Sequence, residues 1–172
     1  MTDEFNAEAF DGAPAGNDEF MAIAFDEVIE PKPFEDGEKL VRVQSATLKY
    51  TNKEPKRPML KVLLIAVDNP NGMYTPMTEH VMLPADPDAK GYQFFLRNLK
   101  HLAVCFELVE ADENGNVAAG QLRMQQDGDN VIFPELVGKE GWVNFKIETD
   151  GEYGDQNRVR RWMPPKTKGL EL

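Results

Sequence analysis

Two short stretches near the end of the chain place aromatic and basic side chains at alternate positions. Because side chains alternate across a β-strand, burial of Val143, Phe145 and Ile147 with Val159 and Met163 turns the intervening residues outward. This outward set comprises Trp142, Asn144, Lys146, Glu148, Arg158, Arg160 and Trp162. Aromatic rings stack on unpaired bases at about 1–3 kcal/mol each, and cations follow the phosphate backbone. The face therefore favours single-stranded nucleic acid, and the alternative is a solvated face with an ion pair such as Glu148 with Arg158.

A second basic cluster occupies the turn between the first two expected strands. Its members are Lys49, Tyr50, Lys53, Lys56 and Arg57, and only Glu54 opposes them. In a small barrel of the OB type, the loop between the first two strands borders the face that binds oligonucleotides. We therefore expect the two clusters to form one groove, with a merely solubilising turn as the alternative.

The chain offers little for catalysis or metal binding. His80 and His101 are its only histidines, and Cys105, four residues after His101, makes at most half a metal site. The sequence contains no glycine-rich phosphate loop, nucleophile elbow or zinc motif. We predict a non-catalytic protein without a cofactor or metal, in which Cys105 is a packed core thiol.

Charge is distributed unevenly along the 172 residues, whose formal net charge is −11. Residues 1–30 contain nine carboxylates and no Lys or Arg. The remainder contains all nineteen basic residues and twenty-one carboxylates, so its formal charge is only −2. An acidic arm on an almost neutral body is compatible with a polyanionic ligand in a way that uniform acidity is not.

The acidic arm, residues 1–34, is too poor in apolar residues to fold alone, and we expect it to be disordered. Phe5, Phe10, Phe20 and Phe25 nevertheless recur along it. Sparse aromatic residues in an acidic segment are typical of a peptide that docks on a protein partner. The alternative is a tail that only increases solubility.

The remainder, residues 35–172, is expected to form one domain, mainly β with one helix (α+β). Apolar patterns predict strands at residues 38–50, 59–67 and 74–83, and a hairpin of residues 141–149 and 157–163 with a long turn. The apolar phase changes within residues 38–50, which indicates a bulge. A helix of about eighteen residues is expected to begin at Asp88 as N-cap, and residues 111–130 to form a loop with a short helical piece around 118–125. This order favours a small, partly open OB-like barrel.

No stretch approaches the roughly 20 apolar residues of a membrane span, and the first residues are acidic where a signal peptide is basic. The single cysteine excludes an internal disulfide framework. These features predict a cytoplasmic protein that does not bind membranes.

The segments FEDGEKLVRVQSATLKYTNKEPKRPMLKVLLIAV and PELVGKEGWVNFKIETDGEYGDQNRVRRWMPP resemble small phage proteins encoded among replication and recombination genes, which are likened to single-stranded-DNA-binding proteins with an OB fold. The most specific match lies between Leu136 and Pro164, and a looser one between Asp36 and Val67. The resemblance implies a phage or prophage origin, an OB-like barrel and single-strand binding, and with them a host-cytoplasmic location and a role in DNA replication or recombination. The chain departs from many such proteins because its acidic arm lies at the N-terminal end, and residues 111–130 look like an insertion.

Taken together, the sequence predicts a non-catalytic single-stranded-DNA-binding protein whose acidic arm competes for the groove or recruits a replication or recombination protein. Two alternatives stay open: a phage structural or interaction module, and an inhibitor whose arm imitates DNA to occupy a host enzyme. The choice between DNA and RNA, the sequence preference and the formation of a homo-oligomer are left open by the sequence.

Overall fold

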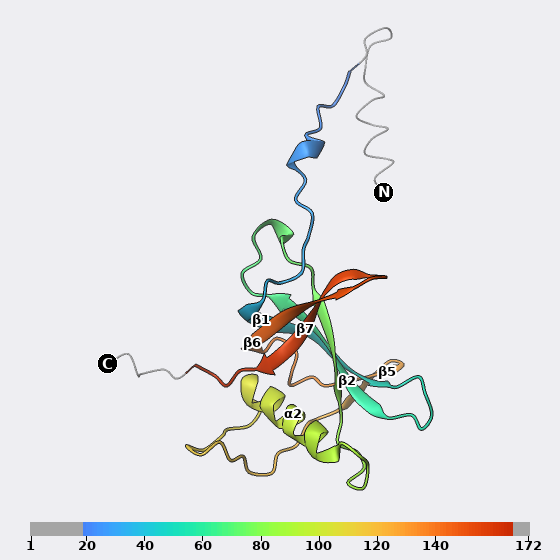
Figure 1. Cartoon of the computed structure of the whole chain (residues 1–172), viewed down its shortest axis with the longest axis vertical. Helices are drawn as coiled ribbons and strands as arrows, with labels where there is room; N and C mark the ends of the chain where they lie inside the picture. The colour runs from blue at the N-terminus through green and yellow to red at the C-terminus, as the bar shows by residue number, and fades with distance from the viewer. Residues whose placement is uncertain (1–18, 167–172) are drawn as a thin grey trace, which may run out of the picture.

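The computed structural model describes residues 19–166 and is mainly β with one helix (Figure 1). The strands are β1 (Gly37–Tyr50), β2 (Pro58–Ala66), β3 (Met77–Met82), β4 (Gln125–Asp127), β5 (Asn130–Ile132), β6 (Glu140–Asp150) and β7 (Gly154–Trp162). The helix is α2 (Tyr92–Cys105), and two short 3-10 turns are η1 (Phe25–Glu27) and η2 (Pro70–Gly72). The order of the main elements is as predicted, with the short hairpin β4–β5 added.

All seven strands belong to one antiparallel sheet, in which β1 is central. One edge of β1 pairs with β2, which pairs in turn with β3. Its other edge pairs with β6 over Gly37–Arg42 and meets β5 at Thr47, and β7 lies beyond β6. The sheet is not closed into a barrel, since β3 and β7 share no backbone ladder. A side chain bridges them instead: the Val159 amide donates to Glu79 Oε2 at 3.3 Å.

The predicted bulge in β1 is confirmed. Val41, Val43 and Ala46 are all buried, although they cannot share one face of a regular strand. The pairing with β2 shifts between Val43 and Ser45, so Gln44 is the extra residue. The bulge lets one long strand serve both the β6 half and the β5 half of the sheet.

The helix is shorter than predicted and begins later. Gly91, with a φ of 88°, occupies the N-cap position, and Asp88 lies in the preceding turn. A left-handed residue at this point favours glycine and starts the helix only after it. The helix end confirms the prediction for Cys105, which is buried, and burial raises the pKa of its thiol to about 12.

The stretch between α2 and β6 contains no helix. Residues 118–124 have no regular secondary structure, so the predicted helical piece there is wrong, and Gln125–Asp127 instead forms β4. The turn DGDN closes the β4–β5 hairpin with Gly128 at a φ of 60°, which is a conformation that glycine adopts readily. Gly120 interrupts the predicted helical piece, and glycine is unfavourable in a helix interior.

The body begins slightly earlier than the expected boundary. Phe34 is fully buried in the core, and Asn157 on β7 clamps its backbone: Oδ1 accepts from the Phe34 amide and Nδ2 donates to the Phe34 carbonyl, both at 2.8 Å. Lys32 already forms a bridge with Tyr74. Residues 19–31 extend away from the body (Figure 1). In the part of the chain that the structure describes, no helix has the length and apolar character needed to cross a membrane.

Candidate nucleic-acid interface

Trp162 does not lie on the predicted exposed face. Phe145 pairs with Val159 but Asn144 pairs with Arg161, so Arg160 is an extra residue in β7. This bulge reverses the alternation, and Trp162 turns into the core opposite Val143 with only 4 % of its surface exposed. The assignment of Trp162 to a stacking surface is therefore wrong. The expectation that Met163 and Ile147 face the core is also wrong, since Met163 is only half-buried and Ile147 is 38 % exposed. The indole ring packs edge-to-face on Phe106, with 5.7 Å between ring centroids.

Four other members of that face, Trp142, Lys146, Glu148 and Arg158, make contacts within the protein. Trp142 is half-buried, and the Lys166 ammonium lies 3.7 Å from its ring centroid. Glu148 forms ion pairs with two cations: its Oε1 lies 2.7 Å from Lys146 Nζ, and its Oε2 lies 3.4 Å from Arg158 Nε. The hydrogen bond from Lys146 contributes most to lowering the pKa of the Glu148 carboxyl. The ion pair considered as an alternative is thus present, and it partly neutralises the two cations.

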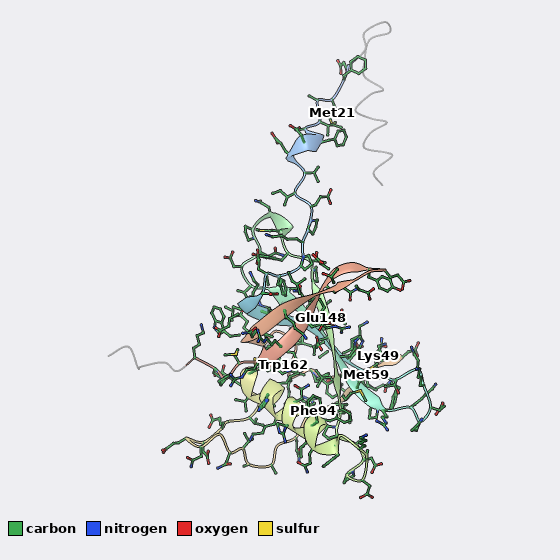
Figure 2. All side chains as sticks on the ribbon, in the orientation of Figure 1. Met21, Lys49, Met59, Phe94, Glu148 and Trp162 are labelled. Atoms are coloured by element: carbon green, nitrogen blue, oxygen red, sulfur yellow. The ribbon has the colours of Figure 1, made fainter. Side chains whose placement is uncertain are left out.

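A concave surface lies where β3, α2 and β7 meet, and it suits a ligand better than the predicted face of β6 and β7. A groove of about 530 Å³ follows the seam between β3 and β7 and is bordered by α2. Its principal lining residues are Glu79, His80, Met82, Phe94, Arg97, His101, Arg160, Arg161 and Trp162. Figure 2 labels Phe94 on α2 and Trp162 on β7, which form two of its walls. Phe94 is 64 % exposed, so its ring is open to a ligand.

The groove is electrostatically positive. Arg97, Arg160 and Arg161 are exposed, and within residues 19–166 none of them forms an ion pair. Burial and the nearby Lys100, Arg161 and Arg97 lower the pKa of His101, and burial with Lys61 and Arg158 lowers that of His80. Among the residues that the structure describes, the only carboxylate in the lining is Glu79, whose pKa is raised by burial. Such a surface attracts anions.

No protein-family model matches the chain, and no curated protein matches it in sequence. Among the described residues, no three His, Cys, Asp or Glu side chains are grouped as metal ligands.

The β1–β2 turn is connected to this groove rather than to Trp142. The register aligns Lys49 with Met59 and Met82, and Thr47 with Lys61 and His80. Because strands lie about 4.8 Å apart, Lys49 is about 10 Å from Met82 at the groove. Trp142, which pairs with Leu40, is nine positions from Lys49 along β1, or about 30 Å. The two predicted clusters therefore do not form one groove through Trp142.

The turn itself presents its cations to solvent. Lys53, Lys56 and Arg57 are exposed, as is 55 % of Tyr50, and within residues 19–166 these cations have no ion-pair partner. Thr51 fixes the turn, since its hydroxyl accepts from the Arg57 amide at 2.9 Å. Between the turn and the groove, the outer face of β1–β2–β3 carries Lys49 and Lys61 beside half-buried Met59, Leu63 and Met82. We call this surface, from the turn to the groove, the basic strip; Lys49 and Met59 mark its turn end in Figure 2.

Sequence reasoning missed the helical side of the groove. Phe94, Arg97 and His101 are spaced i, i+3 and i+7, which places them along one face of α2. That spacing is visible in the sequence, but exposed polar residues along a helix are equally typical of a solvated face. Of the phenylalanines predicted to bind a partner, Phe20 and Phe25 are 88 % and 74 % exposed, and Phe5 and Phe10 lie outside the described residues.

Proposed function

We propose that this protein binds single-stranded DNA without catalysis, along the basic strip and in the groove between β3, α2 and β7. The observation that carries the proposal is the grouping of three arginines, none with an ion-pair partner among residues 19–166, beside an exposed phenylalanine in one concave surface. Guanidinium groups suit phosphates, and an exposed ring offers a stacking platform for a base. Lys61, Lys49 and the turn cations extend the positive surface beyond the groove.

The connectivity supports an OB-like interpretation of the fold. Five strands follow the path β3-β2-β1-β6-β7, with β3 returning toward β7 and α2 inserted between β3 and β6 in the chain. A five-stranded, partly open barrel of this kind commonly binds oligonucleotides beside strands 2 and 3. The basic strip lies on the outer face of these strands, which agrees with that use.

Single strands suit this surface better than duplexes. Phe94 and Tyr50 can stack only on bases whose faces are free, and a duplex hides those faces within its own stack. The strip also carries few carboxylates to repel a phosphate backbone. A role in phage DNA replication or recombination would agree with the sequence resemblance, and the acidic arm would then regulate the groove or recruit a protein of that machinery.

The test is fluorescence anisotropy of a labelled oligo-dT of about thirty nucleotides at several salt concentrations, with duplex DNA as a comparison. Replacing Phe94 by Ser should weaken binding about 5- to 150-fold, the range expected for one lost base stack. The matched control is Leu96→Ser on the same helix, whose side chain lines a different, apolar groove.

The arginines are tested by the salt dependence. Arg160→Ser with Arg161→Ser should reduce the slope of log K against log salt by about 1.4, or about 0.7 for each lost phosphate contact. Arg123→Ser, exposed outside the groove, should leave the slope unchanged. Absence of oligonucleotide binding at low salt would reject the proposal and favour a protein-interaction module. Equal losses in Phe94→Ser and Leu96→Ser would show that the groove is not the binding site.

A further inference from the structure

The arm formed by residues 19–30 carries apolar surface with nothing packed against it in the described structure. Its exposed side chains are Phe20, Met21, Ile23, Phe25, Val28 and Ile29, each more than half accessible to solvent. Met21 is labelled on the arm in Figure 2, well away from the body. The same twelve residues contain four carboxylates and no Lys or Arg. An exposed segment that is both apolar and acidic suits a binding surface that is both apolar and basic.

The arm can change direction without disturbing the core. Before Lys32, the described backbone hydrogen bonds of the arm join only its own residues in and beside η1, from Glu27 to Ala24 and from Val28 to Phe25. The first backbone bonds to the body are made at Lys32, which donates to the Met73 carbonyl and accepts from the Thr75 amide. No core residue precedes Phe34 in the described chain. Segments with so few contacts reorient at low free-energy cost.

We infer that residues 19–30 fold back onto their own body and occupy the groove between β3, α2 and β7, where they compete with nucleic acid. In this state the phenylalanines of the arm pack against Phe94 and Met82, and its carboxylates face Arg97, Arg160 and Arg161. The inference rests on the proposed function for its consequence, which is regulation of DNA binding. The contact between arm and groove stands independently of DNA.

The attachment point favours the chain's own arm over that of a second copy. Asn157 clamps Phe34 and lies three residues before Arg160 on β7, a separation of about 10 Å along the strand. Twelve extended residues span up to about 40 Å, so the arm can reach the whole groove. A segment tethered this closely has an effective concentration in the millimolar range, which exceeds that of a second copy in ordinary solutions.

The contact is tested first without DNA, by energy transfer in the full-length protein. Ala22→Cys on the arm carries an acceptor dye, with Trp162 in the groove wall and Trp142 as donors; the buried Cys105, whose thiol pKa is raised, does not compete for the label. Transfer should be high at low salt, fall severalfold at high salt, and be independent of protein concentration. Arg160→Ser with Arg161→Ser should reduce it, whereas Arg123→Ser should not. Transfer that ignores salt and these arginines would overturn the inference, and transfer that grows with protein concentration would assign the contact to a second copy.

The regulatory consequence is tested with matched charge changes. Neutralising the arm by Asp26→Asn, Glu27→Gln and Glu30→Gln should tighten binding of oligo-dT about tenfold at low salt. The control neutralises three exposed carboxylates of the body, Asp129→Asn, Glu113→Gln and Glu135→Gln, and changes the net charge equally. Equal tightening in both variants would mean a general charge effect and would overturn competition by the arm. Transfer without any oligonucleotide binding would reject the proposed function while retaining the contact.

Discussion

The close approach of β6 to the end of α2 gives a stability prediction that can be worked from distances. Gly141 is buried, and a Cβ atom placed on it would lie 2.8 Å from Cys105 Sγ, 3.0 Å from the Cys105 carbonyl oxygen and 3.1 Å from Phe106 Cδ1. Ordinary contacts between carbon atoms are about 3.5–4.0 Å, so Gly141→Ala must push the helix end away from the sheet. Overpacking of this kind costs about 1–3 kcal/mol, and the loss of unfolded-state freedom offsets about 0.4–1 kcal/mol of that.

The net destabilisation expected for Gly141→Ala is therefore about 1–2 kcal/mol, or a fall in Tm of about 3–6 °C for a chain of this size. Urea unfolding followed by tryptophan fluorescence measures it. Gly151→Ala is the matched control, because nothing lies within 4 Å of that position, and it should change stability by less than about 0.5 kcal/mol. In a Cys105→Ala background the cost of Gly141→Ala should shrink, since the closest atom is gone. Equal effects at the two glycines, or no rescue by Cys105→Ala, would refute the packing described for this contact.

Three further outcomes follow from burial. Trp162→Ala should destabilise by about 3–5 kcal/mol and half-buried Trp142→Ala by clearly less, as measured by urea unfolding; equal losses would contradict the reversed register of β7. The Cys105 thiol has a pKa of about 12 in the folded protein against an ordinary 9.0, so just above pH 9 the thiol ionises only in the unfolded chain. The free energy of unfolding of wild type should therefore fall by about 1.4 kcal/mol relative to that of Cys105→Ala between pH 8 and pH 10. Identical pH profiles of stability would exclude a buried thiol. Burial raises the pKa of the Glu79 carboxyl, so the stability that Glu79 contributes is present at low pH and lost as the pH rises through its folded pKa. In Glu79→Gln the amide oxygen can still accept from the Val159 amide, so the variant should gain stability over wild type at pH 7 relative to pH 4 and bind oligo-dT more tightly. Weaker binding would show that the carboxylate is not unfavourable to the ligand.

Much of the fold could be predicted from periodicity alone. The change of phase between Val43 and Ala46 reveals the β1 bulge in the sequence, because three buried residues define both phases. The bulge in β7 has no such signal. Val159, Arg160, Arg161 and Trp162 fit either register, and an aromatic residue is as suitable for a core as for a stacking surface. Only the pairing with β6 decides between them.

The candidate site could be predicted only where its residues are close together in the sequence. Arg160 and the turn from Lys49 to Arg57 belong to clusters that are local in sequence. The structure places Arg160 in the groove and the turn at the other end of the basic strip. The helical wall was missed because the groove combines residues from β3, α2 and β7, which are separated by tens of positions in the chain. Their proximity depends on the curvature of the sheet, which a single sequence does not encode locally.

The open seam between β3 and β7 also bears on self-association. Two strand edges that are not joined by a ladder expose backbone groups able to pair with strands of other molecules. Here the Glu79 carboxylate accepts the hydrogen bond of the Val159 amide, and α2 borders the seam. The positive charges of Arg158, Arg160 and Arg161 lie around the seam and repel the same surface of another molecule. Arg160 and Arg161, which belong to the surface proposed to bind phosphates, thus also protect the sheet against edge-to-edge aggregation. Replacing them by apolar residues would favour fibril-like assembly, besides weakening the proposed binding.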